Sequence, residues 1–360
     1  MLRGLLRRSS ADLLKRYSQV IWASPCLERL IPQSITSVQD LSRYTSLTQF
    51  PPDLNAYTEG LCKPAWSMLA RRGKSWRGTF CLLTTKAFGG EVQQAIPLAI
   101  SCELLHNASL IIDDVEDKSE VRRGKPAVHM LFGEELAINA GCYLYFVAQL
   151  AVKETTLSAE VQARLSGLYL RELLALHLGQ CSDLQWNRIP NFMPTPEQYF
   201  QMVVSKTGAM VRLPVHLGAQ VANCSVETIE KLMQLSENLG IAFQIRDDVL
   251  NLESETYAAS RKYLGEDITE GKKTLITVFA CETSPKAARL LEILSMKTSD
   301  LALVQEALGI IKDSGALGRA NQECIRFQTQ AESLINAVFP QCEAKDHLKA
   351  IVRFLLQRSA

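Results

Sequence analysis

Two aspartate-rich clusters are the residues of this chain whose types and spacing most directly indicate chemistry. The first is Asp113-Asp114-Val115-Glu116-Asp117, and the second is Asp247-Asp248-Val249-Leu250-Asn251. Each follows an apolar stretch, residues 104–112 before the first cluster and residues 235–245 before the second. Carboxylates are costly in apolar surroundings unless cations pair with them. Both clusters are therefore candidate cation sites.

Helical spacing would place the carboxylates of each cluster together. Residues i and i+4 share one face of a helix, so Asp113 and Asp117 would project together, with Asp114 beside them. The same spacing would align Asp247 with Asn251. A single acidic run is usually a solvated helix face. Two runs of similar spacing favour Mg²⁺ sites, because Mg²⁺ binds through a few carboxylates and completes its shell with phosphate oxygens.

Basic residues flank both clusters along the chain. They occur in Gly73-Lys74-Ser75-Trp76-Arg77, Arg122-Arg123-Gly124, Lys206-Thr207-Gly208, Lys262 and Gly271-Lys272-Lys273-Thr274. Arginine binds phosphate bidentately, and lysine acts as a point charge. Each of these residues alone is more often a surface residue than a ligand. Together with the acidic clusters they indicate two diphosphate pockets, one that uses metal ions and one that does not.

Composition narrows the class of protein. The chain has 360 residues, of which 47% are hydrophobic and 21% are charged, and its net charge of +1 gives no sign of nucleic-acid binding. No uninterrupted apolar run approaches the roughly 20 residues of a transmembrane helix. The 10 cysteines are scattered without metal-ligand spacing, so we expect neither a zinc site nor a disulfide framework.

The first 25 residues differ from the rest. They contain Arg3, Arg7, Arg8, Lys15 and Arg16 against a single acidic residue, Asp12, with leucines and serines between them. Such a segment is typical of an organelle transit peptide, so we expect a mitochondrial or plastid location, or otherwise a cytoplasmic one. The alternative is an N-terminal helix that packs on the domain.

The rest of the chain divides into a connector and one large helical region. Residues 31–55 are polar and contain Pro32, Pro51 and Pro52, which would break a long helix. Apolar residues recur at helical spacing in residues 96–112, 165–178, 232–245 and 302–311. The pattern predicts an N-terminal extension over residues 1–55 and a single all-α domain over residues 56–360.

From about Ala56 onward the chain resembles the trans-prenyltransferases, or isoprenyl diphosphate synthases, of the polyprenyl synthetase family. The likeness is greatest to the eukaryotic geranylgeranyl diphosphate synthases. The ordered motifs are residues 106–117 followed by Arg122-Arg123-Gly124, His177-Leu178-Gly179-Gln180, Lys206-Thr207-Gly208, residues 243–248 and residues 265–272. Asn251 departs from the Asp of many relatives, and Ile276 replaces a usual Pro.

The resemblance implies an isoprenoid synthase fold, which is a single large helical bundle around a deep apolar cavity, and a homodimer. It implies that the substrates are isopentenyl diphosphate and an allylic prenyl diphosphate. Three Mg²⁺ per active site would be held by Asp113, Asp114, Asp117 and Asp247. It gives no reason to expect a nucleic-acid partner or a transmembrane segment.

The resemblance also implies roles for the remaining site residues. Asp248 would assist the metal site, with Thr207 and Gln244 lining the allylic pocket. The allylic diphosphate would be neutralised by Arg122, Lys206, Lys262 and Lys272. Isopentenyl diphosphate would be bound by Lys74, Arg77, His106 and Arg123. The allylic C–O bond would ionise, and the double bond of isopentenyl diphosphate would attack the cation.

Product length would depend on the floor of the cavity. The small residues Ala108 and Ser109 would leave room for growth, and a floor of Tyr145, Phe146 and His177 would stop it at a C20 product. The competing interpretation of these aromatic residues and this histidine is ordinary core packing. Three other functions stay open: a synthase of longer polyprenyl diphosphates, a terpene cyclase, and a non-catalytic subunit of a heteromeric synthase.

Overall fold

The computed structural model describes residues 10–42, 44–45, 50–253 and 265–356. These residues are helical almost throughout, and their two short strands form one antiparallel hairpin. The prediction of an all-α fold is confirmed. The chain forms two compact units, unit 1 with residues 1–166 and 217–223, and unit 2 with residues 167–216 and 224–360. Unit 1 thus contains residues of both the expected N-terminal extension and the expected helical domain, which meet at residue 55.

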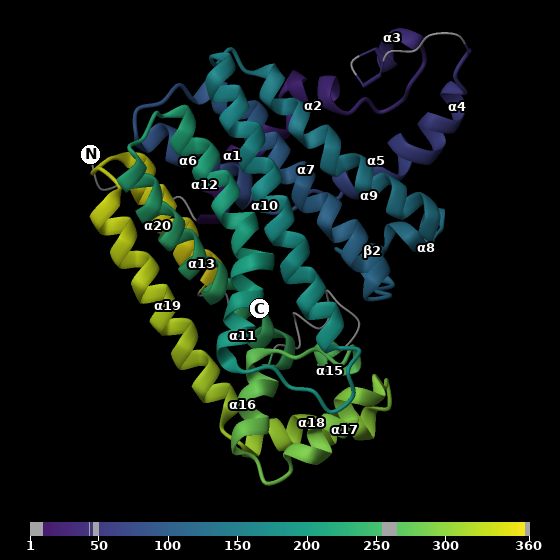
Figure 1. The fold of residues 1–360 in the computed structure, drawn as a ribbon, viewed down its shortest axis with the longest axis vertical. Helices are drawn as coiled ribbons and strands as arrows, with labels where there is room; N and C mark the ends of the chain where they lie inside the picture. Colours follow the sequence, from purple (N-terminus) through teal and green to yellow (C-terminus); the bar gives the residue numbers. More distant parts are fainter. Residues whose placement is uncertain (1–9, 43, 46–49, 254–264, 357–360) are drawn as a thin grey trace. The chain divides into compact units, whose positions relative to one another are not determined.

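Unit 1 is built around the 25-residue helix α7 (Figure 1). Its elements are α1 (Ser10–Trp22), α2 (Pro25–Leu30), α3 (Val38–Leu41), α4 (Leu54–Tyr57), the π-helical turn η1 (Thr58–Cys62), α5 (Lys63–Leu69), α6 (Trp76–Ala87), α7 (Val92–Glu116), β1 (Val121–Arg122), β2 (Lys125–Pro126), α8 (Val128–Phe132), α9 (Glu134–Gln149) and the 3₁₀ turn η2 (Leu150–Glu154). Helices α6 and α9 both pack on α7. Because α7 buries residues on nearly every side, its sequence is apolar almost all round.

Residues 10–22 belong to the packed structure of unit 1. Helix α1 packs on α6 and α7 and buries Leu13, Leu14, Ile21 and Trp22. The interpretation as a packed N-terminal helix therefore describes residues 10–22, whereas the cellular location of the chain stays a prediction. The first part of the polar connector is folded as well, since Ile35 and Leu41 are buried in one cluster with Cys62.

Unit 2 is organised by α13, which packs along α19 (Figure 1). Its elements are α10 (Ala159–Trp186), which begins in unit 1, α11 (Pro196–Val203), the π-helical turn η3 (Val204–Gly208), α12 (Ala209–Val221), which ends in unit 1, α13 (Val226–Glu253), α15 (Glu266–Thr269), α16 (Leu275–Thr283), α17 (Ala287–Met296), α18 (Leu301–Asp313), α19 (Ala316–Val338) and α20 (Glu343–Leu356). Helix α11 starts at a capping box of Thr195 and Gln198, with Pro196 in its first turn.

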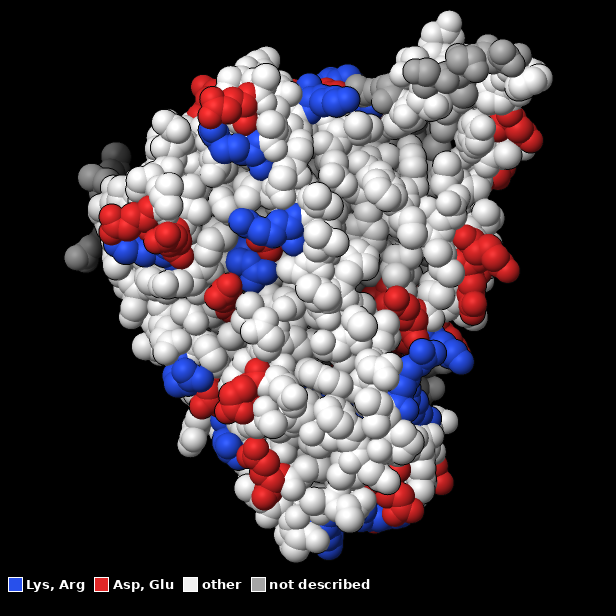
Figure 2. Space-filling view, in the orientation of Figure 1, with Lys and Arg blue, Asp and Glu red and all other residues white. Residues whose placement is uncertain are grey.

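Two segments are long and apolar enough to cross a membrane by length and composition alone, Val92–Glu116 and Glu134–Glu154. In the first, 72% of the apolar window is buried inside the protein, as expected for a core helix. On the face drawn in Figure 2, lysines and arginines lie scattered among acidic side chains and wide uncharged areas. That face shows no broad basic area of the kind that binds a polyanion.

Candidate active site

The first aspartate cluster lies at the C-terminal end of α7. Asp113 and Asp114 belong to its last turn, and Asp117 is the C-cap residue, whose N–H donates to the Asp113 carbonyl at 2.8 Å. Carboxylates at this end of a helix oppose the helix dipole, and the last turn contains no basic residue. The local sequence therefore lowers helix stability at this point, which favours a functional role for the carboxylates.

Asp114 is the buried member of the cluster and pairs with Arg122. Its exposed fraction is 1%, and the Nε of Arg122 donates to its Oδ1 at 2.8 Å. Its Oδ2 has no hydrogen-bond partner among the described residues. Burial raises the pKa of Asp114, while the Arg122 guanidinium lowers it. The second carboxylate oxygen is thus available to a further cation.

Arg122 is itself held by backbone contacts. The Nη1 of Arg71 donates to the Arg122 carbonyl at 3.0 Å, and the Nε of Arg71 donates to the Ser67 carbonyl at 2.8 Å. Arg122 stands on strand β1 of the hairpin that follows α7. The hairpin therefore returns the predicted arginine to the aspartates that precede it in the sequence.

Three residues predicted to bind isopentenyl diphosphate gather around a buried carboxylate in unit 1. Arg77 and Arg123 both act electrostatically on Glu103, which is 2% exposed. Burial lowers the pKa of Arg77 to about 10, so this guanidinium stays charged at neutral pH. Burial, together with Arg77 and Arg123, lowers the pKa of His106 well below its usual value. We call Arg77, His106 and Arg123 the basic cluster.

The segment that carries Lys74 lies against the basic cluster. A Cβ atom placed on Gly73 would stand 2.9 Å from an Nη atom of Arg123. The Nη1 of Arg123 also donates to the Oδ1 of Asn107 at 3.1 Å, and Arg77 lies 4.3 Å from the Trp76 ring centroid. Lys74 is exposed and sits between Gly73 and the start of α6.

Backbone strain is concentrated near these basic residues. Among the described non-glycine residues of unit 1, positive φ angles occur at Arg72, Ser75, Lys118, Arg123 and Asn223. Arg72 and Ser75 flank Gly73-Lys74, and Arg123 follows the hairpin strand. A residue held at positive φ requires support from its surroundings, and such residues cluster at functional sites.

The second aspartate cluster lies near the C-terminal end of α13 in unit 2. Asp248 is buried, and the Tyr199 hydroxyl donates to its Oδ2 at 2.7 Å while the Gln244 amide donates to its Oδ1 at 2.9 Å. Burial and the nearby Asp267 raise the pKa of Asp248 to about 7. Both oxygens of Asp248 are thus engaged by protein groups, whereas Asp247 beside it is half-buried.

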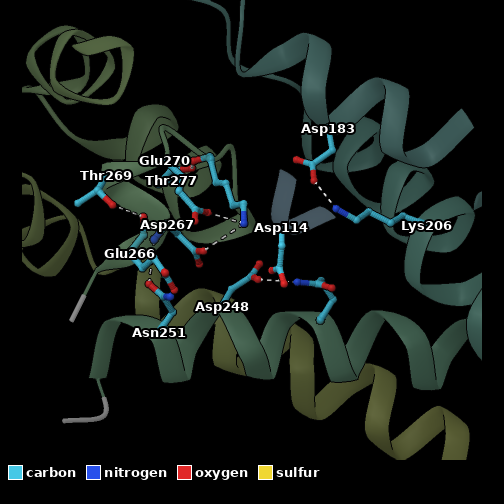
Figure 3. A network of polar contacts seen from close by, with 12 residues as sticks. Asp114, Asp183, Lys206, Asp248, Asn251, Glu266, Asp267, Thr269, Glu270 and Thr277 are labelled. Carbon is cyan, nitrogen blue, oxygen red and sulfur yellow. Dashed lines mark hydrogen bonds and ion pairs between the residues drawn. The ribbon is translucent and has the colours of Figure 1, made fainter. Parts of the chain in front are cut away.

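Lys206 and Thr207 are presented by the π-helical turn η3. The Lys206 ammonium forms an ion pair of 2.8 Å with Asp183 near the end of α10 (Figure 3). The Thr207 hydroxyl donates to the Gln244 Oε1 at 2.8 Å. The structure therefore brings Thr207, Gln244 and Asp248 into one hydrogen-bonded chain.

The turn η3 is held in place by a buried arginine and by helix α10. The Nη1 of Arg212 donates to the Val204 carbonyl at 2.9 Å, and Glu172 forms a 2.8 Å ion pair with the same guanidinium. A Cβ atom on Gly179 would stand only 2.4 Å from the backbone nitrogen of Lys206. Because a π turn interrupts the regular helical ladder, these contacts are needed to fix it.

Lys272 lies in an acidic environment in the middle of the segment between α15 and α16. Its ammonium stands 2.5 Å from Glu270 and 4.0 Å from Asp267. The Oδ1 of Asn251 accepts a hydrogen bond of 3.2 Å from the backbone N–H of Asp267 (Figure 3). The amide that replaces an aspartate thus orders the neighbouring segment through its carbonyl oxygen. Lys262 lies outside the described residues.

The predicted floor residues differ in exposure. Ala108 is buried, and Ser109 and Tyr145 are half-buried. Phe146 is 72% exposed in the single chain. His177 is exposed too, and its Nδ1 lies 2.8 Å from the Leu173 carbonyl. The single chain therefore does not enclose Phe146 or His177, and their role in limiting product length stays a prediction.

The donor set fits a metal ion that shares its ligands with a substrate. Among the described residues, no three His, Cys, Asp or Glu side chains gather closely enough to hold an ion by themselves. Mg²⁺ usually keeps several waters and binds one or two carboxylates together with phosphate oxygens. Asp114, with one buried oxygen that lacks a hydrogen-bond partner, can supply such a carboxylate ligand.

Several residues of the site were not predicted from the sequence. They contact predicted residues from distant positions: Asp183 contacts Lys206, Tyr199 contacts Asp248, Arg212 contacts the η3 backbone, and Glu103 underlies the basic cluster. Asp183 carries a weak signal, since it is an acidic residue three positions beyond the predicted Gly179-Gln180 motif. The others depend on tertiary packing, which no local spacing indicates.

Comparisons with known proteins agree with this geometry. The model of the polyprenyl synthetase family matches residues 58–311, a range that contains every predicted site residue. The chain is 37% identical over 235 residues to a geranylgeranyl pyrophosphate synthase of Gibberella zeae, which covers 65% of this chain and 61% of that protein. It is 37% identical over 252 residues to a short chain isoprenyl diphosphate synthase of Methanocaldococcus jannaschii, with 69% and 75% coverage.

Solved structures share the fold over nearly the whole chain. The crystal structure of a geranylgeranyl pyrophosphate synthetase from Pyrococcus horikoshii superposes with a TM-score of 0.82 at 29% identity. That superposition covers 97% of this chain and 98% of the other. The likeness therefore includes residues of the expected N-terminal extension, before residue 56, as well as residues of the expected synthase domain.

Proposed function

The chain belongs to the polyprenyl synthetase family, and we propose that it condenses isopentenyl diphosphate with an allylic diphosphate to give an all-trans prenyl diphosphate. One observation supports the proposal: unit 1 contains two separate groups of charged residues with the chemistry to bind phosphate. One is the aspartate cluster at the end of α7, with Arg122 paired to Asp114. The other is the basic cluster over Glu103, which needs no metal ion. A terpene cyclase ionises one diphosphate and has no use for the second arrangement.

We propose that the first arrangement receives the allylic diphosphate. Three Mg²⁺ ions would be held by Asp113, Asp114, Asp117 and Asp247. When bound, they would neutralise the diphosphate and make it a better leaving group. Arg122, Lys206 and Lys272 would add positive charge around the phosphate oxygens. Each of these side chains now pairs with a carboxylate, so binding would exchange that carboxylate for phosphate.

The basic cluster is suited to isopentenyl diphosphate. Arg77 and Arg123 supply two guanidinium groups for bidentate contacts with phosphate, and Lys74 supplies a point charge. His106 stays neutral at physiological pH because its pKa is lowered, so it can donate a hydrogen bond to a phosphate oxygen. Glu103 beneath the guanidinium groups limits the cost of burying two like charges together.

The reaction then proceeds by bond breaking followed by bond formation. The allylic C–O bond breaks, and its electron pair leaves with the diphosphate. The double bond of isopentenyl diphosphate attacks the allylic cation, and a proton lost to the departing diphosphate restores a double bond. The Thr207 and Gln244 oxygens can stabilise positive charge without forming a covalent bond, because they are fixed to each other and to Asp248.

We propose a C20 product and a homodimer. The family relatives include a geranylgeranyl pyrophosphate synthase, and the small Ala108 and Ser109 leave room beside the first cluster for a C20 chain.

The homodimer is supported by an exposed apolar row on α10. The row consists of Leu170, Leu174 and Leu178 at i, i+4 and i+8, with exposed fractions of 59%, 59% and 69%. Such a row is costly in water unless another surface covers it.

The proposal is tested by leaving out one component at a time. The purified full-length chain is incubated with Mg²⁺, isopentenyl diphosphate and dimethylallyl, geranyl or farnesyl diphosphate, and the lipid products are collected. We expect product only when both diphosphates are present, and none after the divalent ions are chelated. A cyclic hydrocarbon formed from the allylic diphosphate alone would identify a cyclase. A folded chain without any product would indicate a subunit that needs a partner.

A further inference from the structure

We propose that Trp22 of the N-terminal helix α1 is a positioning residue for isopentenyl diphosphate, and that it acts through Ser75. The inference rests on the proposed function, because that function assigns Lys74 and Arg77 to the isopentenyl diphosphate site. Ser75 lies between these two residues, immediately before α6. Trp22 lies 53 positions earlier in the chain and does not itself contact the basic cluster by a hydrogen bond.

A buried hydrogen bond links the two residues. The indole Nε1 of Trp22 donates to the Ser75 Oγ at 2.7 Å, and the Ser18 hydroxyl lies 3.1 Å from the same oxygen. Trp22 is 6% exposed and Ser75 is 2% exposed. A buried donor that loses its partner incurs the cost of its desolvation without compensation. The link is therefore strong enough to influence the conformation of Ser75.

The conformation of Ser75 is one that needs support. Its φ is +50°, in the left-handed region that a side chain with a Cβ atom rarely adopts. A serine before a helix normally has extended backbone and caps the first N–H groups with its hydroxyl. Ser75 makes no such cap. Its hydroxyl is instead engaged by α1, and this engagement accounts for the unusual backbone.

The turn at Ser75 sets the position of the basic residues on either side of it. Before the turn, Gly73 lies against the Arg123 guanidinium. After it, the Gly78 N–H donates to the Glu103 Oε1 at 2.9 Å, which fixes the first turn of α6 beside the carboxylate that Arg77 faces. A change of φ at Ser75 would therefore move the Gly73-Lys74 segment relative to Arg77.

Helix α1 is also packed too closely to be a detachable segment. The Ile21 Cδ1 atom lies 2.8 Å from the place that a Cβ atom on Gly78 would occupy, and Ile21 is fully buried. Removal of the first 25 residues as a transit peptide would uncover this surface and delete the Trp22 donor. We therefore infer that the active enzyme retains α1, so a targeting signal within these residues would not be removed together with it.

The test compares two tryptophans of unit 1. Trp22→Phe removes the indole donor and keeps most of the apolar volume. Trp66→Phe is the matched control, because the Trp66 Nε1 donates to the Pro32 carbonyl at 3.1 Å, with no contact to Ser75. Each full-length variant is assayed with Mg²⁺ for the KM of each diphosphate, for kcat and for thermal melting.

We expect Trp22→Phe to raise the KM for isopentenyl diphosphate about tenfold, as for loss of a buried hydrogen bond. The KM for the allylic diphosphate should change less than about twofold, and Trp66→Phe should change neither KM. Ser75→Ala should reproduce the effect, and the double variant should add little to either single change, because both remove the same link.

Three results would overturn the inference. These are an unchanged KM for isopentenyl diphosphate in Trp22→Phe and Ser75→Ala, an equal rise in Trp66→Phe, or a lower melting temperature without any change of KM. Lys74→Ala is measured in parallel. If it raises this KM while Trp22→Phe does not, only the positioning role is wrong. If it too leaves the KM unchanged, the proposed isopentenyl diphosphate site is wrong.

Discussion

At the scale of single residues, Asp114 shows how the charge of a buried carboxylate is compensated by the protein itself. One of its oxygens accepts hydrogen bonds from Arg122, and the other has no hydrogen-bond partner among the described residues. An isolated buried carboxylate would be costly, so the arginine compensates for one oxygen and leaves the other for a cation. Binding of a metal-bound diphosphate would then let Arg122 exchange its contact with Asp114 for one with phosphate.

Removal of a proposed metal ligand should mainly lower turnover. We expect Asp113→Ala and Asp247→Ala each to reduce kcat by about 100-fold, because the leaving group would be less well neutralised. Glu116→Ala is the control, since this exposed acid stands in the same turn of α7 and has no proposed role as a ligand. Steady-state assays over a Mg²⁺ titration measure the effect. Equal activity of Asp113→Ala and Glu116→Ala would remove Asp113 from the site.

A buried histidine should make the stability of the fold depend on pH. Burial and the neighbouring Arg171 lower the pKa of His216 to about 4 from an ordinary value of 6.5. The unfolded chain therefore binds the proton more readily than the folded chain does. The contribution of neutral His216 to the free energy of unfolding is complete above pH 6.5 and is lost as the pH falls toward 4. Each unit of pKa difference corresponds to about 1.4 kcal/mol.

The measurement is the melting temperature between pH 7 and pH 5. The native chain should lose more stability over this range than His216→Gln, whose amide does not titrate. Parallel melting curves for the two proteins, with equal losses, would show that His216 does not contribute to the pH dependence.

The sequence could predict the chemistry of single residues better than their partners. The identities and order of Asp113, Lys206 and Asp247 indicated diphosphate binding. Asp183, which pairs with Lys206, lies 23 positions away. Tyr199, which contacts Asp248, lies 49 positions away. These contacts arise from the packing of separate helices, which the local spacing of residues in the sequence does not predict.

At the scale of elements, the π turn η3 is the device that presents Lys206 and Thr207. A regular helix would carry these residues with a different rotation, and the bulge leaves backbone groups that need other partners. Arg212 supplies one partner at the Val204 carbonyl. The close approach of α10 at Gly179 supplies steric support, because any side chain there would collide with the backbone of Lys206.

This support can be tested with two glycines of the same helix. Gly179→Ala should lower stability by about 1–3 kcal/mol and reduce kcat, because a Cβ atom would displace the Lys206 backbone. Gly167→Ala is the matched control: this exposed glycine of α10 has no heavy atom within 4 Å of the added Cβ, so alanine should stabilise the helix by about 1 kcal/mol. Chemical denaturation and steady-state assays measure both effects. Similar behaviour of the two variants would contradict the role assigned to Gly179.

Helical periodicity predicted the main elements and failed at their irregularities. The apolar spacing in residues 96–112 and 232–245 marked parts of α7 and α13 correctly. The π turns η1 and η3 have no such signal, since one extra residue in a turn hardly changes a hydrophobic pattern. In α1, a basic amphipathic sequence fits a transit peptide and a packed helix equally well. Only the burial of its apolar side chains, Ile21 and Trp22 among them, shows the packing.

At the scale of the whole molecule, the row of leucines on α10 predicts how two chains associate. We expect the native chain to sediment as a dimer and Leu174→Glu to sediment as a monomer, because the charge would stand in the middle of the apolar row. Ile325→Glu is the control, since it places the same charge at a 61% exposed apolar residue of another long helix, α19. A dimer that survives Leu174→Glu would place the interface elsewhere.

The fold was predictable because several motifs occur in a fixed order between residues 106 and 272, and together they match one family of proteins. The likeness to the Pyrococcus horikoshii structure covers 97% of the chain, which extends beyond the region in which the sequence motifs lie. Product length was less accessible. The exposed Phe146 shows why, since the single chain leaves most of this side chain uncovered and so does not define its surroundings.

The most direct test of the central claim is the size of the product. The full-length chain, with α1 retained, is incubated with Mg²⁺, isopentenyl diphosphate and farnesyl diphosphate, and the dephosphorylated products are measured by mass. The proposed function predicts a dominant linear C20 alcohol. Chains of C25 or longer would keep the prenyltransferase reaction and reject the floor assigned to Tyr145, Phe146 and His177. Farnesyl diphosphate recovered unchanged from a folded, Mg²⁺-supplied enzyme would contradict the assignment of the chain as an active synthase.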